Sequence, residues 1–187
     1  MSSTILKTWL TAVCSLLVIS GAASGDSPIS GKFELTDHNG QDVTEKSYDG
    51  KLRLVFFGFT RCPDVCPTTL FEIRNALEQI GDDADQVRVL FVSVDREYDS
   101  KDQLANYAGA FHPSVIGLTG SDEQLAAAAE AFNVTYGIQS AEDSVSGNEE
   151  IFHTAYVFLM DRRGGFIDVM GYGTRASRIA ETLERYL

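Results

Sequence analysis

Between residues 53 and 94 the chain passes from an apolar strand pattern through a turn with two cysteines into a helix pattern, and then into a second apolar strand pattern. The first strand is predicted over residues 53–57, the helix over 67–80 and the second strand over 87–94. A strand, a helix and a strand in succession imply a parallel pair, whose faces need helices to cover them. We therefore expect an α/β fold.

The two cysteines of this turn, Cys62 and Cys66, are predicted to lie at or just before the N-terminus of the helix. Unpaired backbone N–H groups and the positive end of the helix dipole favour a thiolate there. Two sulfurs four positions apart can converge on one small ion or close a short disulfide. The turn is therefore predicted to be redox-active, metal-binding or both. A purely structural disulfide is the alternative, and so short a loop would constrain the unfolded chain little.

Length and charge narrow the class of protein. The chain has 187 residues, which suits one folded domain, and we expect a monomer. Its formal net charge of −12 and its pI near 4.5 argue against nucleic acid or an anionic membrane surface as a partner, because phosphate contacts need a basic face.

The N-terminus differs from the rest of the chain. Lys7 precedes an apolar stretch over residues 9–19, and small residues follow at 20–24. Residues 1–24 are predicted to be a signal peptide or an N-terminal membrane anchor, since the apolar run is just long enough to cross a bilayer. Cys14 lies inside this run and is interpreted as a small apolar residue. We expect a linker over 25–31 and an exported domain over 32–187, either periplasmic, membrane-anchored facing the periplasm, or in an equivalent compartment such as the mitochondrial intermembrane space.

The remaining elements follow from the same patterns. Before the first central strand we expect an N-terminal hairpin around Asn39-Gly40, and after the second a helix capped by Asp99 or Ser100. A short connecting strand over 115–118, a helix over 124–132 capped by Ser121 and a mobile polar loop over 139–150 follow. The chain is then predicted to form a hairpin of strands over 155–160 and 166–170 and a last helix over 175–186. This order matches a thioredoxin-like fold: a central mixed sheet with helices on both faces and an added N-terminal β-hairpin.

The site differs from that of an ordinary thioredoxin-like oxidoreductase, which has two residues between its cysteines and a proline before the strand that faces them. Here three residues separate the cysteines, and His153-Thr154 takes the place of the proline. Two thiolates and one imidazole suit copper, because sulfur holds Cu(I) and the added imidazole also suits Cu(II). Structural zinc would need a fourth ligand. We expect His38 and His112 to be solvated or capping groups.

Four segments, in order, resemble the SCO/SenC family of copper-binding, thioredoxin-like proteins. They are residues 33–40, residues 55–60 followed by Cys62-Pro63-Asp64-Val65-Cys66-Pro67, residues 93–95, and His153 with Tyr156, Leu159 and Asp161. The resemblance implies a copper metallochaperone that assists assembly of the binuclear copper centre in subunit II of cytochrome c oxidase, by copper delivery, by reduction of the target cysteines, or both. It implies that Cys62, Cys66 and His153 bind Cu(I) or Cu(II). The implied partner is that subunit or another cuproprotein, and the resemblance does not identify the upstream copper donor or the thiol reductant.

Two departures from the family pattern concern charge. Arg96 follows Asp95 where the family usually has proline, and Arg61 precedes Cys62. Arg61 is predicted to stabilise the thiolates electrostatically. Asp64, between the cysteines, is interpreted as a group that orients the turn or touches a partner, or as an ordinary acid at a helix start. Asp95 is interpreted as a cap or a loop hydrogen-bonding group.

Two other functions stay open. An extracytoplasmic thiol-disulfide reductase would use the same cysteine pair, so enzymatic activity is not settled by these residues. A thiol peroxidase usually carries threonine three residues before its reactive cysteine, whereas Phe59 and Pro63 stand there. A copper or redox sensor is the third possibility, although the sequence supplies no signalling module.

Overall fold

The computed structural model describes residues 29–143 and 150–187. The predicted signal or anchor over 1–24 therefore lies outside the described residues, as do most of the predicted linker and residues 144–149 of the predicted mobile loop. Within the two described ranges, no helix combines the length and the apolar character needed to cross a membrane.

A seven-stranded mixed sheet forms the centre of the molecule, in the order β2-β1-β5-β4-β3-β8-β9. β3, β4 and β5 run parallel, while β8 pairs antiparallel with β3 and β9 antiparallel with β8. The strands are β1 (Glu34–Asp37), β2 (Asp42–Thr44), β3 (Leu52–Gly58), β4 (Val87–Ser93), β5 (Val115–Thr119), β8 (Tyr156–Met160) and β9 (Phe166–Gly171).

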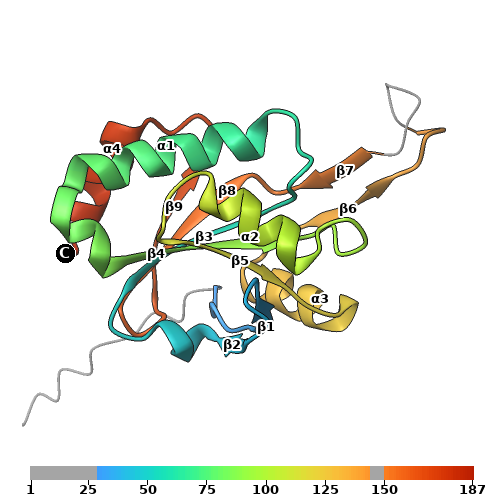
Figure 1. Ribbon diagram of the computed structural model, residues 1–187, viewed down its shortest axis with the longest axis horizontal. Helices are drawn as coiled ribbons and strands as arrows, with labels where there is room; N and C mark the ends of the chain where they lie inside the picture. Colours follow the sequence, from blue (N-terminus) through green and yellow to red (C-terminus); the bar gives the residue numbers. More distant parts are fainter. Residues whose placement is uncertain (1–28, 144–149) are drawn as a thin grey trace, which may run out of the picture.

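Helices cover both faces of this sheet (Figure 1). One apolar core joins the sheet to α1 (Val65–Ile80), α2 (Lys101–Gly109) and α4 (Ala176–Glu184), and the other joins it to α3 (Asp122–Ala131) and the β1–β2 hairpin. Short 3-10 helices, η1 (Glu45–Tyr48) and η2 (Gly81–Gln86), precede β3 and β4. The expected thioredoxin-like arrangement is confirmed.

The central strands are apolar throughout because they are buried on both faces. Successive side chains of a strand point to opposite faces. In β3, Leu54 and Phe56 pack into the core beneath α1, whereas Val55 and Phe57 pack into the core above α3. This alternation explains the continuous apolar runs that predicted a parallel sheet.

The N-terminal segment forms an antiparallel β1–β2 pair. Its turn contains Gly40 at a φ of 82°, a left-handed value that glycine adopts without strain. The Asp37 carboxylate accepts hydrogen bonds from the backbone amides of Asn39 and Gln41 at 2.8 and 2.9 Å. β1 also pairs with β5. The strand over 115–118, expected as a short connection, is therefore an internal strand of the main sheet.

A second, two-stranded sheet extends from one end of the molecule (Figure 1). β6 (Tyr136–Gln139) pairs antiparallel with β7 (Glu150–His153), and His153 lies opposite Tyr136. The prediction of a loop over 139–150 is wrong at both ends, because Gln139 and Glu150 are paired strand residues. We call this two-stranded sheet the ribbon.

Candidate metal centre

Two separate parts of the chain bring Cys62, Cys66 and His153 together. The cysteines come from the turn between β3 and α1, and the histidine ends β7. The two sulfurs and a ring nitrogen lie within 4.8 Å of one another. Cys66 Sγ is 3.5 Å from His153 Nε2, and the Cys66 amide donates to Cys62 Sγ at 3.4 Å.

The start of α1 sets the positions of the two sulfurs. α1 begins at Val65, two residues earlier than predicted, so Cys66 lies in its first turn and Cys62 just before it. Amides in the first turn of a helix have no partner within the helix. The amide of Cys66 therefore donates to the sulfur of Cys62, and the Cys62 amide donates to the carbonyl of Phe59 at 3.3 Å.

Cys66 is fully buried, and Gly58 provides the space for its sulfur. A Cβ atom on Gly58 would lie 2.7 Å from Cys66 Sγ and 2.8 Å from the Phe91 ring. Both distances are shorter than carbon and sulfur atoms tolerate. The glycine at the end of β3 therefore permits the close approach of the helix thiol to the sheet.

Burial decides the ionisation of Cys66. Burial raises the pKa of the Cys66 thiol, and the nearby Cys62 and Asp99 raise it further, while a hydrogen bond from the backbone at Phe59 lowers it. The sequence-based expectation that the helix N-terminus favours the thiolate is therefore outweighed at Cys66 in the metal-free chain. A cation beside the sulfur would reverse the balance, because metal binding deprotonates a coordinating thiol.

His153 presents one nitrogen to the cysteines. Its ring packs edge-on against Phe56 and Phe59, with centroid distances of 5.9 Å to each. His153 Nδ1 lies 3.2 Å from the carbonyl oxygen of Thr154, which can only accept, so Nδ1 carries the hydrogen. In the neutral ring the lone pair of Nε2 then faces Cys66. Burial lowers the pKa of His153, which favours the neutral form that binds metals.

Arg61 and Asp64 lie beside the cysteines but bond elsewhere. Arg61 Nε donates to Asp95 at 2.6 Å, and its guanidinium lies 5.1 Å above the ring of Tyr98. Asp64 accepts from the Thr68 hydroxyl at 3.2 Å and from the Tyr172 hydroxyl at 3.5 Å. The charge of Arg61 is therefore balanced by Asp95, and Asp64 ties the helix start to the segment after β9.

Sequence reasoning missed the role of Asp99 beneath the turn. Its buried carboxylate accepts from the Thr60 amide at 2.9 Å, the Thr60 hydroxyl at 2.5 Å and the Ser93 hydroxyl at 2.6 Å. Ser100, not Asp99, caps α2. One feature of the sequence could have indicated this role: Asp99 follows the carboxyl end of β4, and β4 lies next to β3, the strand that leads into the cysteine turn.

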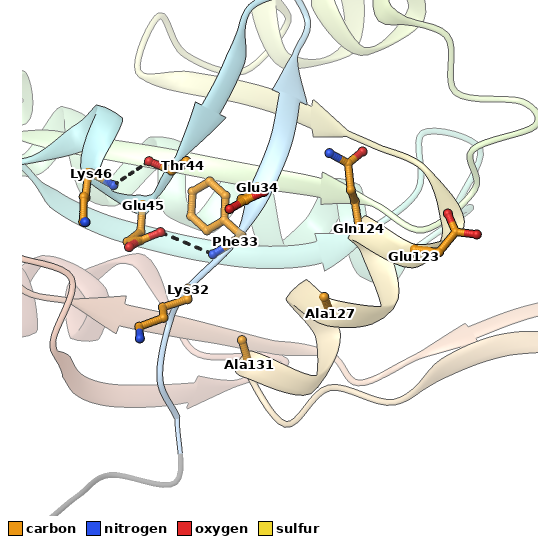
Figure 2. Close-up of a pocket in the computed structure, with 10 residues that line it drawn as sticks. All are labelled: Lys32, Phe33, Glu34, Thr44, Glu45, Lys46, Glu123, Gln124, Ala127 and Ala131. Carbon is orange, nitrogen blue, oxygen red and sulfur yellow. Dashed lines mark hydrogen bonds between the residues drawn. The ribbon is translucent and has the colours of Figure 1, made fainter.

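An open cavity of about 570 Å³ gives access to the site. Its walls are mostly apolar and include Phe59, Val65 and Phe152, with Cys62 and His153 among the lining residues. Another cavity, of about 490 Å³, lies between the β1–β2 region and α3, on the face of the sheet opposite α1 (Figure 2). Its lining combines lysines and glutamates with Phe33 and alanines and contains no cysteine or histidine, so it offers no soft metal ligands.

The three donor atoms suit a soft metal ion. Metal–sulfur and metal–nitrogen bonds of about 2.0–2.3 Å, as found at zinc sites, hold ligand atoms within about 4.6 Å of each other. The observed spread of 4.8 Å is close to that limit. Two sulfurs and an imidazole accommodate copper in either common oxidation state. Among the described residues, this is the one group of three histidine, cysteine, aspartate or glutamate side chains whose ligand atoms lie close enough to share an ion.

The SCO1/SenC family model matches residues 21–187 of this chain. Among curated proteins, protein sco1 of Schizosaccharomyces pombe is 32% identical over 88% of this chain and 63% of its own length. The mitochondrial SCO1 homolog of Homo sapiens is 34% identical over 87% of this chain and 54% of its own length. The chain thus spans about half to two thirds of the length of these relatives.

A solved structure also resembles this one closely. The structure of Bradyrhizobium japonicum ScoI with copper bound is 42% identical in sequence and superposes with a TM-score of 0.75, covering 85% of this chain and 99% of that chain.

Proposed function

The chain belongs to the SCO1/SenC family, and from that premise we propose that it is a copper metallochaperone that assists assembly of the binuclear copper centre of cytochrome c oxidase. Copper is its cargo, and Cys62, Cys66 and His153 are the proposed ligands. The proposed partner is the copper-site domain of subunit II of the oxidase, or another cuproprotein. Delivery of copper and reduction of the partner's cysteines are both compatible with the site.

One observation carries this proposal. Two sulfurs from the start of α1 and the lone-pair nitrogen of a neutral imidazole from β7 converge beside an open cavity that Cys62 and His153 line. Soft sulfur and borderline imidazole donors select copper over the hard cations that prefer oxygen. The partial exposure of Cys62, beside the buried Cys66, gives a partner protein access to the cargo from one side.

Copper titration of the purified, reduced chain tests the proposal. A Cys14→Ser background leaves only the two proposed thiol ligands. We expect one copper per chain, loss of Cu(I) and Cu(II) binding in Cys62→Ser and Cys66→Ser, and a weaker Cu(II) complex with an altered visible spectrum in His153→Ala. His112→Ala is the matched control, because the ring of His112 accepts from the Ser114 amide of its own loop at 3.1 Å and is not part of the cysteine site. Equal copper binding by the His153 and His112 variants would rule out the three-ligand site.

A thiol-disulfide reductase is the second candidate, and the unequal burial of the two thiols favours it. A partly exposed Cys62 can attack a disulfide while the buried Cys66 resolves the mixed disulfide. Insulin reduction by the metal-free chain tests this candidate. Fast turnover without measurable copper affinity would replace the metallochaperone proposal.

We also propose an exported location, with residues 1–24 as a signal peptide or membrane anchor, 25–31 as a linker and 32–187 as the functional domain. The apolar run after Lys7 supports export, and relatives of this chain are described as mitochondrial. Mass measurement of the mature protein separates the two forms: cleavage removes the segment and anchoring retains it.

A further inference from the structure

One edge of the ribbon has no strand beside it. β7 pairs with β6 alone, and no other strand of the described residues lies along its second edge. At the base of the ribbon, the Thr154 amide points at the β6 side and donates to the Thr135 carbonyl at 2.8 Å. Backbone groups alternate in direction along an antiparallel pair. The N–H and C=O groups of Ile151 and His153 therefore point away from β6, toward the free edge.

This free edge of β7 borders the cavity at the metal centre. Residues 150–153 are consecutive, and all four line the cavity of about 570 Å³. Successive side chains of a strand point to opposite faces, so a space that all four residues line runs along the edge of the strand. None of the described lining residues belongs to β6, and the opposite wall is the cysteine turn, with Phe59 and Cys62. An extended chain placed along β7 would therefore pass beside Cys62.

The free edge of β7 lacks the features that usually prevent pairing with another chain. Exposed sheet edges pair readily with further strands, and proteins protect them with lysine, proline or bulges. Residues 150–153 include no lysine or proline, and their pairing with β6 is continuous. Phe152 is 49% exposed and lines the cavity. The edge thus combines unpaired backbone groups with apolar side chains, the combination that binds an added strand.

Charge favours a different protein over a second copy of this chain as the occupant. Each copy carries a formal net charge of −12, so two copies repel each other. Glu150 on β7 and Asp64 in the cysteine turn are exposed acids, whereas the charge of Arg61 is balanced by Asp95 at 2.6 Å. The free edge therefore favours a segment that carries basic residues.

We propose that the free edge of β7 binds an extended, cysteine-containing segment of the copper acceptor as a third strand of the ribbon. Residues directly opposite each other in paired strands lie on the same face, with Cβ atoms about 5 Å apart. A cysteine opposite His153 would share the face of the imidazole, which approaches Cys66 at 3.5 Å. The acceptor cysteine would then lie beside the proposed copper ligands. This inference rests on the proposed function, because it assigns the binding mode of the proposed partner.

A synthetic peptide tests this strand addition. A fluorescein-labelled Lys-Val-Thr-Cys-Thr-Val-Lys-amide carries its cysteine between two valines on one face and has a lysine at each end. Fluorescence anisotropy measures its affinity for the reduced, metal-free chain in the Cys14→Ser background. We expect saturable binding of one peptide per chain. Hydrogen exchange at the Ile151 and His153 amides should slow when the peptide binds, whereas exchange at the Ile138 amide, on the opposite edge of the ribbon, should not change.

Ile151→Pro and Ile138→Pro form a matched pair of variants. The two isoleucines lie directly opposite each other in the ribbon, so the N–H groups of both point to the outer edges. Proline removes this donor without removing a bond between β6 and β7. We expect Ile151→Pro to weaken peptide binding about tenfold and Ile138→Pro to leave it unchanged. Equal peptide affinities of the two variants, or no binding by the unsubstituted chain, would overturn the inference.

Methylated peptides repeat the test without altering the protein. In an added strand, alternate peptide amides point at β7, whether the strand runs parallel or antiparallel. N-methylation of the cysteine, or of the threonine that follows it, should therefore block binding in one of the two peptides only. Equal affinities of these two peptides would overturn the inference and leave the proposed function standing. Failure of the unsubstituted chain to bind copper would instead overturn the proposed function, because peptide binding is measured without metal.

Discussion

The cysteine turn and the ribbon contribute to one site but are held in different ways. Every residue of β3, which leads into the turn, is buried, and Cys66 belongs to the main core. Both strands of the ribbon have only intermediate or exposed residues, and Phe152 on β7 is 49% exposed. Two donors are thus fixed by the core of the domain, while the third comes from a strand outside the core and depends on backbone pairing in the ribbon and on the contact of its ring with Phe56 and Phe59.

This difference suggests a division of roles between the ligands. The sulfurs are placed by contacts whose loss also costs global stability, because core contacts and buried hydrogen bonds support both. His153 is placed by hydrogen bonds at the base of the ribbon, where Thr154 donates its amide to the Thr135 carbonyl at 2.8 Å. Changes on the ribbon side should therefore affect copper binding with little effect on folding.

The largest expected effect is on the cysteine side, at Asp99. Asp99→Asn replaces a carboxylate that accepts three hydrogen bonds with a group that has one acceptor oxygen. We expect a loss of about 3 kcal/mol in the free energy of unfolding, together with weaker copper binding, because Thr60 no longer anchors the turn. Urea unfolding and copper titration measure both effects.

Asp102→Asn is the matched control for charge. Asp102 is an exposed acid in the first turn of α2, so its substitution should cost less than about 1 kcal/mol through the helix dipole alone. Equal losses of stability in the two variants would show that Asp99 does not anchor the turn.

The sequence predicted those parts of the site that depend on neighbouring residues. The change from strand to helix around Cys62 and Cys66 is a pattern of consecutive residues, and His153 was identified from its position before the strand that faces the cysteines. The bonds of Asp99 to Thr60 and Ser93 join three separate segments, so no local pattern shows them. The ribbon was missed because neither of its faces is buried, which removes the apolar alternation that identifies a strand.

The ionisation of Cys66 is a second property that neighbouring residues do not determine. The position of the residue at a helix start is a local property and favours the thiolate. Its burial depends on the absence of a side chain at Gly58 and on Phe91 of the neighbouring strand, and burial raises the pKa. Such packing across the sheet follows only from the three-dimensional structure.

Gly58→Ala should have the next largest effect. The added methyl group would overlap Cys66 Sγ and the Phe91 ring at 2.7 and 2.8 Å, so one of them must move. We expect a loss of about 2 kcal/mol in the free energy of unfolding, typical of overpacked cores, and a shifted sulfur that weakens copper binding. Gly109→Ala in α2 is the control: apart from its chain neighbours and the backbone of its own helix, no atom of the described residues lies within 4 Å of the added methyl group, and alanine in a helix is favourable. Unchanged copper affinity in Gly58→Ala would contradict the view that the core fixes the position of Cys66.

The smallest effect on stability is expected on the ribbon side, at Thr154. Its hydroxyl accepts from the Thr135 amide at 3.0 Å and lies 3.2 Å from the Thr135 carbonyl. Thr154→Val removes both bonds from a partly exposed position and should cost less than about 1 kcal/mol in unfolding free energy. Because His153 is the neighbouring residue and its Nδ1 bonds to the Thr154 carbonyl, Cu(II) affinity should fall more than Cu(I) affinity, which depends mainly on the sulfurs.

Thr36→Val, which loses an exposed bond to Asp42 on the far edge of the main sheet, should change neither affinity. If Thr154→Val lowered both affinities equally, the ribbon would be holding the whole site, and the separation of the two regions would be wrong.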